Sequence, residues 1–412
     1  MKLNFFIIIQ ILLQFSLLHT FLRKKKFDED GNQNQNLENI QELSQLINLE
    51  QDKLKIKNFG FENKKEFLKD KIMAHRGLFG YLPEHTQKGF ELAYFMGADF
   101  METDIGLTKD GKMIVFHDPV LDEATNIKDF PEFAKRKTSK KVDGKLIENK
   151  FFITDFTYEE IQKLNTVQRH SNRPQIYNKE FKVLLIENVI DMVLDFNNKY
   201  NKTTGVYIEP KNLGLIKQDL NKDLNEELLK VLQKYNLTNF YNEEFKKCPI
   251  VIQSFDKPTL QFFKEKADLP HIYLIGWGDF INIKESVNFT DGLGPNIKYL
   301  LYERVDDLLV ANGTHYKSKE DFKKNVVKKN FEDSIEVLGN IIKPKKNNIF
   351  VDYAHSLDLI VAPYDINNDT PKFDHKPEFE FCKMKMLKVD SFFADFCDTA
   401  LFSTKNAPGL CN

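Results

Sequence analysis

From about residue 70 onward, the chain alternates between two patterns of hydrophobic and polar positions. Short apolar runs bounded by glycine, proline or charged residues predict buried strands, and longer stretches with apolar residues three and four positions apart predict helices. Strands are predicted at 72–75, 99–107, 112–118, 205–211, 249–255, 271–277, 291–295, 359–366 and 391–396. Helices are predicted between many of them, at 87–97, 186–196, 224–236, 257–267 and 350–359.

The order of these elements indicates the fold class. Strands that alternate with helices imply a parallel sheet, and this many strand–helix units favour a closed barrel over a doubly wound sheet. We therefore predict an α/β protein with a (β/α)₈ TIM barrel. The turn-forming residues 109–111 lie between two strand runs and predict a hairpin that extends the second strand.

Two segments fit no strand–helix unit. Residues 119–180 and about 303–348 are rich in lysine and are longer than ordinary connections in an α/β domain. We predict that both are insertions, one after strand 2 of the barrel and one after strand 6.

The N-terminal 22 residues are dominated by apolar side chains. A short basic start followed by an apolar run over residues 5–22 is typical of a secretory signal peptide. The run also approaches the length that spans a bilayer, so an uncleaved signal anchor is the alternative, and a basic cluster follows at 23–26. We predict entry into the secretory pathway, giving a secreted, lumenal or cell-surface protein, with residues 5–22 as a membrane anchor if they are not removed.

Composition also sets the predicted domain boundaries. The stretch after the apolar run is rich in Asn, Gln, Glu and Lys, and it predicts a linker or a helix packed outside the main domain. The predicted organisation is a signal peptide or anchor at 1–22, a polar linker or helical extension at 23–69, the barrel domain at 70–404 and a tail at 405–412.

Glycosylation sequons and cysteines agree with an extracytoplasmic route. Five Asn-x-Ser/Thr sequons lie at Asn201, Asn236, Asn288, Asn312 and Asn368. The four cysteines are Cys248, Cys382, Cys397 and Cys411. They form no Cys-x-x-Cys pair, which argues against a zinc site. In an oxidising compartment they permit one or two disulfides with three complete pairings, and buried free thiols are the alternative.

The overall charge excludes one class of partner. The chain has 59 basic and 61 acidic residues, a net charge of −2, so it lacks the basic footprint of a nucleic-acid-binding protein. Hydrophobic residues make up 42% of the sequence, including 37 Phe, which is enough for a large core.

Polar residues that carry chemistry fall at the ends of consecutive predicted strands. The carboxyl ends of barrel strands form one rim, where barrel enzymes place their sites, and residues two apart on a strand share a face. The first strand ends in His75 and Arg76, the second carries Glu102 and Asp104, the hairpin returns with His117 and Asp118, and the third strand ends in Glu209 and Lys211. We predict that these side chains converge on the rim.

Each residue type has a function at such a rim. Glu102, Asp104 and Glu209 are hard oxygen ligands suited to one divalent cation, Ca²⁺ or Mg²⁺, which would relieve their mutual repulsion. Arg76 and Lys211 offer hydrogen-bond donors to an anionic substrate. Together with two histidines as acid and base, this equipment is typical of metal-assisted phosphodiester cleavage.

Each of these residues also has a structural interpretation. A single histidine at a strand end is more often a satisfied polar residue than a catalyst, and a Glu-x-Asp pair usually lies on a solvated face. Asp118 is interpreted as a turn residue before Pro119. Trp277 and Tyr364 are candidate pocket residues, although aromatics at such positions are more often core. Structural roles are assigned to His85, His170, His271, His315, His355 and His375.

Several segments resemble those of a known family. AHRGLFGYLPEHT (74–86), GADFMETDIGLTKDGKMIVFHDPVLDEATNI (97–127) and GVYIEPK (205–211) are similar to the signature blocks of the glycerophosphodiester phosphodiesterase family. The similarity is to its bacterial periplasmic and plant-type branch, within the phospholipase-C-like phosphodiesterase superfamily. VIQSFD, DGLGPN, LDLIVAPYDIN and FFADFCDTA match later blocks, and ITDFTYEEIQKLN resembles the insertion of that branch, so the resemblance covers about residues 70–404.

The resemblance implies a fold, an activity and a cofactor. It implies a TIM barrel that uses a divalent cation to hydrolyse glycerophosphodiesters, such as glycerophosphocholine and glycerophosphoethanolamine, to sn-glycerol 3-phosphate and an alcohol. His75 and His117 match the family's acid–base pair, Glu102, Asp104 and Glu209 its metal ligands, Arg76 its phosphate contact, Lys211 the basic residue after the third ligand, and Glu84 a motif glutamate with a positioning role. Pro210 departs from the commoner Glu-Leu-Lys or Glu-Ile-Lys form.

The same residues leave other functions open. A phospholipase D-like or phosphoinositide-specific enzyme can use the same barrel, and a secreted barrel without catalytic activity is a third class. The expected partner is a small-molecule glycerophosphodiester, with no nucleic acid and with membrane contact only through the N-terminal segment. The head-group preference, the cation, the oligomeric state and the nucleophile, either water or the adjacent glycerol hydroxyl, stay undetermined.

Overall fold

The computed structural model describes residues 63–276, 279, 283–301, 349–369 and 377–406. The predicted signal segment, most of the extension at 23–69, the insertion at 303–348 and Trp277 lie outside the described residues. Nothing in the described residues tests the predicted domain boundaries, which stay predictions.

Eight parallel strands form a nearly closed barrel. Their spatial order is β10-β9-β8-β7-β6-β2-β1-β11. The two ends of this order, β10 and β11, are joined by hydrogen bonds between their flanking residues. The Asp390 amide donates to the Val361 carbonyl at 2.9 Å, and the Ile366 amide donates to the Phe393 carbonyl at 3.1 Å. The strands are β1 (Lys71–Ala74), β2 (Phe100–Leu107), β6 (Gly205–Pro210), β7 (Ile250–Ser254), β8 (His271–Ile275), β9 (Gly292–Pro295), β10 (Ile360–Val361) and β11 (Ser391–Ala394). The predicted (β/α)₈ barrel is therefore confirmed.

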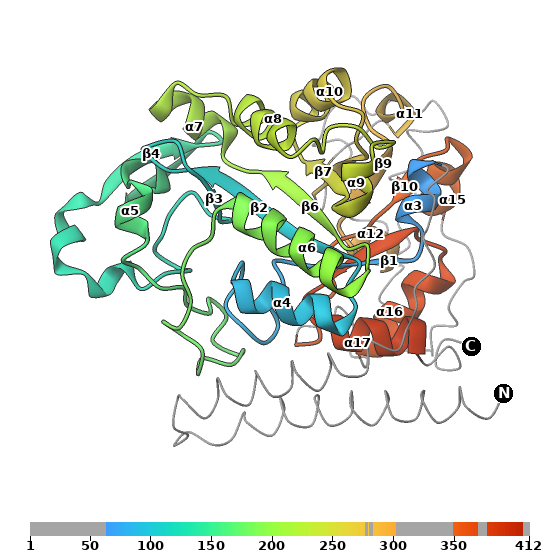
Figure 1. Ribbon diagram of the computed structural model, residues 1–412, viewed down its shortest axis with the longest axis horizontal. Coiled ribbons are helices and arrows are strands. Elements are labelled where there is room, and N and C mark those ends of the chain that lie inside the picture. The colour runs from blue at the N-terminus through green and yellow to red at the C-terminus, as the bar shows by residue number, and fades with distance from the viewer. Residues whose placement is uncertain (1–62, 277–278, 280–282, 302–348, 370–376, 407–412) are drawn as a thin grey trace, which may run out of the picture.

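Helices surround this barrel on the outside (Figure 1). Those at the predicted positions are α4 (Gln87–Met96), α6 (Ile186–Tyr200), α8 (Leu224–Lys234), α10 (Lys257–Lys266) and α15 (Ile349–Ser356). The others are α3 (Lys64–Leu68), α7 (Leu213–Leu220), α9 (Glu243–Lys247), α11 (Ile283–Ser286), α12 (Lys298–Leu301), α16 (Pro377–Met386), α17 (Cys397–Leu401) and a final turn at Phe402–Asn406. No helix in the described part of the chain is long and apolar enough to cross a membrane.

Local sequence explains why α6 forms and which face it buries. Its buried apolar side chains recur at the three- and four-residue spacing of one helix face, and they are Ile186, Val189, Ile190 and Val193. The helix ends where Asn201 adopts the left-handed conformation, with φ of 50°. This face packs against the barrel, so the amphipathic pattern alone predicts the orientation of the helix.

The hairpin predicted after the second strand is present. Strand β3 (Met113–Val115) pairs antiparallel with β2, with Ile105 opposite Val115 and Leu107 opposite Met113. This hairpin returns the chain to the carboxyl end of the barrel, where His117 follows.

The insertion at 119–180 has a small hydrophobic core of its own. It contains the strands β4 (Thr138–Val142) and β5 (Lys145–Lys150), the helix α5 (Tyr158–Ile161) and 3₁₀ turns at Ile127–Asp129, Pro131–Arg136 and Ile153–Asp155. Figure 1 shows it extending to one side of the barrel, at the left of the view. Phe133, Phe151 and Phe156 pack together there with Phe116, which follows β3, so the insertion is attached to the hairpin that carries His117.

The structure shows the redox state of three of the four cysteines. Cys248 and Cys397 are buried free thiols, and Cys382 is disulfide-bonded. Cys411 lies outside the described residues. A buried-thiol state therefore holds for two of the four cysteines.

Candidate active site

The predicted rim residues, apart from Asp118, gather in one pocket at the carboxyl end of the barrel strands. The pocket is lined by His75, Arg76, Glu102, Asp104, His117, Glu209, Lys211 and Tyr364, together with Gln253, Phe255, Leu274, Asp365 and Phe393. Convergence of the strand-end residues, expected from the barrel geometry, is therefore observed.

Strand periodicity and register bring three carboxylates together. Glu102 and Asp104 are two apart on β2 and point to the same face, and Asp104 lies directly opposite Glu209 in the parallel pairing of β2 with β6. One oxygen from each of the three lies within 4.8 Å of the others, and all three residues are buried. Carboxylate oxygens at this spacing fit a hard divalent cation such as Ca²⁺ or Mg²⁺.

The electrostatics of this group show how crowded its negative charge is. Burial, reinforced by the Asp104 carboxylate, raises the pKa of Glu102 to about 8. Burial also raises the pKa of Glu209 to about 7, against the opposing effect of Lys211. Burial disfavours the charged form of Asp104 as well, but His117, Lys211 and Arg76 hold its pKa well below its usual range. A bound cation would stabilise the charged form of all three.

Fixed hydrogen bonds orient Glu102. One of its oxygens accepts the backbone N–H of Arg76 at 2.8 Å, and the other accepts from the Gln253 side chain at 3.1 Å. Arg76 achieves this with φ of 53°, a left-handed conformation that non-glycine residues rarely adopt.

The two cations at the rim are also held in place. The Arg76 guanidinium lies 3.1 Å from Glu84 and 3.4 Å from Asp104. The Lys211 ammonium lies 2.7 Å from Glu209 and 3.6 Å from Asp104. Arg76 and Lys211 both line the pocket, so they present positive charge to an anionic ligand that binds there.

His85 was assigned a structural role, and the structure shows what that role holds in place. Its Nε2 donates to Asp104 at 3.0 Å, and the residue is almost fully buried. Its backbone φ of 56° places it in the left-handed region. His85 therefore helps to orient a carboxylate of the predicted cation site, a role that the sequence spacing did not reveal.

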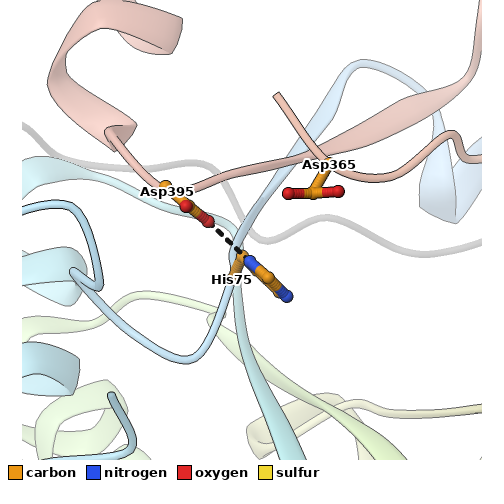
Figure 2. A group of neighbouring side chains, drawn as sticks. All are labelled: His75, Asp365 and Asp395. Atoms are coloured by element: carbon orange, nitrogen blue, oxygen red, sulfur yellow. Dashed lines mark hydrogen bonds and ion pairs between the residues drawn. The ribbon is translucent and has the colours of Figure 1, made fainter. Parts of the chain in front are cut away.

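His75 is paired with a carboxylate from the last strand of the barrel. Its Nδ1 lies 2.5 Å from Asp395, which follows β11, and its other ring nitrogen points away from that carboxylate (Figure 2). Burial lowers the pKa of His75, but Asp395 outweighs burial and raises it to about 9. His75 is thus protonated at neutral pH, with an Nε2–H available on the pocket side.

His117 has the opposite protonation state. Its Nδ1 donates to Asp118 at 2.6 Å. Burial and the nearby Arg76 cation lower the pKa of His117 to about 4, so the ring is neutral at pH 7. Two histidines in one pocket whose pKa values are pushed apart are suited to act as acid and base.

Several residues at the site had no predicted role. Asp118 was interpreted as a turn residue, and Asp365 and Asp395 lay unassigned within quoted motifs. One carboxylate oxygen of Asp365 lies within 4.8 Å of a ring nitrogen of His75 and of a carboxylate oxygen of Asp395. The side-chain amide of Asn367 donates to Asp365 at 2.8 Å. The sequence signal for Asp365 and Asp395 was their position after predicted strands, but no sequence pattern indicates that either lies next to His75.

The insertion also reaches the site, which was not predicted. Arg169 lies 2.6 Å from Glu84 and 2.9 Å from Asp118. Arg173 lies 2.5 Å from Asp395. The segment between α5 and α6 therefore contacts the carboxylate partners of both histidines.

The two aromatic candidates have different outcomes. Tyr364 lies on the pocket wall, where its hydroxyl donates to the Ile275 carbonyl at 3.0 Å and its ring contacts Phe255 edge-on at 5.8 Å. Trp277 lies outside the described residues.

Comparisons with known proteins agree on one family. The glycerophosphoryl diester phosphodiesterase family matches residues 75–279. A glycerophosphodiester phosphodiesterase of Arabidopsis thaliana is 31% identical over 336 residues, which cover 79% of this chain and 83% of the relative. One from Haemophilus influenzae is 32% identical over 232 residues, or 52% of this chain and 59% of the relative.

Solved structures share the fold. A provisionally named glycerophosphoryl diester phosphodiesterase from Silicibacter pomeroyi superimposes with a TM-score of 0.54 at 17% identity, covering 82% of this chain and 95% of that one. A phosphodiesterase from Oleispira antarctica, solved with its product sn-glycerol-3-phosphate, gives 0.52 at 14% identity, covering 82% and 98%. At these identities the likeness establishes the barrel, and the resemblance read from the sequence motifs is confirmed by the family match and the relatives.

Proposed function

Because the chain belongs to the glycerophosphoryl diester phosphodiesterase family, we propose that it hydrolyses glycerophosphodiesters such as glycerophosphocholine and glycerophosphoethanolamine to sn-glycerol 3-phosphate and an alcohol. One observation carries the proposal: three buried carboxylates, two histidines of opposite protonation state and Arg76 line a single pocket. The names of the relatives favour this substrate class over a phospholipase D-like or phosphoinositide-specific activity.

Glu102, Asp104 and Glu209 would hold one divalent cation. When bound, such a cation neutralises charge on the phosphate oxygens and so lowers the barrier to attack. The oxygen-only donor set supports Ca²⁺ or Mg²⁺ and disfavours zinc. We leave the choice between those two cations to experiment.

Arg76 and Lys211 would bind the phosphate. Both line the pocket, and both are fixed by neighbouring carboxylates, so they are oriented before substrate arrives. Positive groups that need no reorganisation stabilise developing negative charge efficiently.

The two histidines would transfer protons on opposite sides of the phosphorus. His117 is neutral, with Nδ1–H committed to Asp118, so Nε2 can remove a proton from the attacking oxygen. His75 is protonated and can give its Nε2 proton to the leaving alcohol. The attacking oxygen belongs either to water or to the adjacent glycerol hydroxyl, and a cyclic phosphate product would identify the second.

An assay of glycerol 3-phosphate release tests this proposal. We expect release from glycerophosphocholine and glycerophosphoethanolamine, loss of turnover in EDTA, and recovery when Ca²⁺ or Mg²⁺ is added back. Turnover that is confined to intact phospholipids, or that persists in EDTA, would contradict the proposal.

We further propose that residues 1–22 direct the chain into the secretory pathway. The basic start and apolar run support this, and the sequon residues Asn201, Asn236 and Asn288 are exposed, so they are accessible to glycosylation. Treatment of the native protein with an N-glycosidase should reduce its mass. An unchanged mass together with an intact N-terminus in the cytosolic fraction would contradict this localisation.

A further inference from the structure

Two arginines of the insertion repeat the same contact at the two histidines. Arg173 lies 2.5 Å from one oxygen of Asp395, whose other oxygen lies 2.5 Å from His75. Arg169 lies 2.9 Å from one oxygen of Asp118, whose other oxygen lies 2.6 Å from His117. Each histidine therefore contacts a carboxylate that in turn contacts a guanidinium group. Both guanidinium groups come from the five-residue segment 169–173.

Arg173 is built rigidly into this arrangement. It is only 5% exposed. Its guanidinium also contacts Asp369 through Nε at 2.8 Å and Nη2 at 3.1 Å, and its Nη1 donates to the Phe79 carbonyl at 3.3 Å. The planar group lies 4.4 Å from the centre of the Phe79 ring. With this many contacts the guanidinium can hold Asp395 in a single orientation.

Arg169 connects the second histidine to the phosphate-binding side of the pocket. Besides Asp118 it contacts one oxygen of Glu84 at 2.6 Å, and the other oxygen of Glu84 accepts from Arg76 at 3.1 Å. The backbone of this segment is secured by Gln168, whose side-chain amide donates to the carbonyls of Phe79 and Leu82 at 3.0 and 3.1 Å. The insertion is thus bound to the loop that follows β1.

We propose that Arg169 and Arg173 are positioning residues for the acid–base pair, so that the insertion, not the barrel alone, orients both histidines. This proposal rests on the function proposed above. A carboxylate with one oxygen taken by arginine presents its other oxygen to Nδ1–H, which fixes the orientation of both rings and the tautomer of the neutral His117, and so aims Nε2 at the substrate. Without the arginine, the carboxylate, buried in Asp395 and half-buried in Asp118, lacks its guanidinium partner and can turn away from the histidine.

The first measurements are the kinetics of Arg169→Gln and Arg173→Gln on glycerophosphocholine. We expect each to lower kcat by roughly 10–100-fold, the usual cost of losing an orienting partner. KM should change by less than about threefold, because neither arginine lines the pocket. Arg169→Lys and Arg173→Lys should recover part of the loss. Arg136→Gln is the matched control, since Arg136 belongs to the same insertion but pairs with Glu160 and stacks on Phe156; it should keep wild-type kcat.

Double variants separate positioning from general damage to the fold. If Arg173 acts through His75, adding Arg173→Gln to His75→Ala should change kcat by less than about twofold, because effects along one unit are not additive. Adding Arg173→Gln to His117→Ala should instead multiply the two losses. Arg169→Gln should show the reverse pairing. Losses that multiply in every combination would overturn the proposal.

A spectroscopic measurement keeps the proposal testable apart from turnover. In protein labelled with ¹⁵N-histidine, the short Nδ1–H···carboxylate contacts predict two downfield imidazole protons. Arg173→Gln should shift the resonance of His75 only, and Arg169→Gln that of His117 only. Unchanged resonances in both variants would refute the positioning role, whereas wild-type protein that fails to hydrolyse glycerophosphodiesters would refute the proposed function instead.

Discussion

At the scale of single residues, burial makes the charged groups of the pocket depend on one another. Glu102 and Glu209 have raised pKa values because burial and the Asp104 charge oppose their ionisation. Asp104 stays ionised because cations surround it. Three buried carboxylates that repel one another destabilise the folded protein when no cation is bound, so a bound cation should increase its stability.

Replacing one carboxylate should therefore separate metal binding from folding. We expect Glu102→Gln to lower kcat by more than the roughly 10–100-fold that an orienting partner costs. Added Ca²⁺ or Mg²⁺ should raise the unfolding temperature of the wild type, since a ligand at 100 times its Kd stabilises by about 2.7 kcal/mol. It should not raise that of Glu102→Gln. The exposed Glu265→Gln serves as the control, and an equal metal-induced rise in both variants would contradict the ligand assignment.

The two histidines predict a bell-shaped pH dependence of kcat/KM. His117 must be neutral to accept a proton, so activity should be lost as the pH falls through its pKa of about 4. His75 must be protonated to donate, so activity should also be lost as the pH rises through about 9. In His75→Gln the alkaline limb should disappear while the acid limb remains; an alkaline limb that survives would assign it to another group.

At the scale of elements, the loop after β1 is shaped by its backbone as much as by its side chains. Gly77 has φ of 80°, and a Cβ there would lie 3.1 Å from the Gly89 carbonyl carbon of α4. Arg76 precedes it in the same left-handed region. The tight turn is what lets the Arg76 amide reach Glu102, so helix α4, the loop and strand β2 define the pocket together.

Gly77→Ala should consequently destabilise the protein. We expect a loss of about 1–2 kcal/mol in the free energy of unfolding, from the positive φ and the close approach of backbone atoms. Gly214→Ala in α7 is the matched control, because a Cβ there meets no atom within 4 Å, and it should be neutral or stabilising by up to about 1 kcal/mol. Urea denaturation measures both; equal effects would show that the turn does not require glycine.

At the scale of the whole molecule, the active site combines parts that are distant in the sequence. His75 and Asp395 are 320 residues apart, and Arg173 and Asp395 are 222 apart. Closure of the barrel places β11 beside β1, and this closure creates the His75–Asp395 pair. The insertion then packs against the same rim, so the carboxylate partners of both histidines are contacted by the barrel and the insertion together.

A shortened chain tests how much of the molecule the site needs. The described pocket residues all lie between His75 and Phe393. We expect a variant that begins at residue 63 to retain kcat within about twofold of the full-length protein, since truncation is tolerated where the pocket and the barrel's hydrogen bonds remain intact. Equal metal dependence in the two proteins is the second criterion; a large loss of kcat with an unchanged unfolding temperature would place a functional element before residue 63.

The sequence alone determined the features that depend on local patterns. Alternation of apolar runs predicted the eight barrel strands and the hairpin, and the strand-end positions of His75, Glu102, Asp104, His117 and Glu209 predicted one shared rim. These predictions succeed because residues two apart on a strand point to the same face, and because the carboxyl ends of parallel barrel strands meet at one rim. The motifs of the same segments also sufficed to identify the family.

Only the tertiary structure decided which groups surround those residues. Asp395 beside His75, Arg169 and Arg173 behind the carboxylates, and His85 against Asp104 all arise from contacts between segments that no local pattern connects. The protonation states follow from burial and from these neighbours, which exist only in the folded chain. Residue identities thus specified the chemistry available, while closure of the barrel and packing of the insertion decided how each group is charged and oriented.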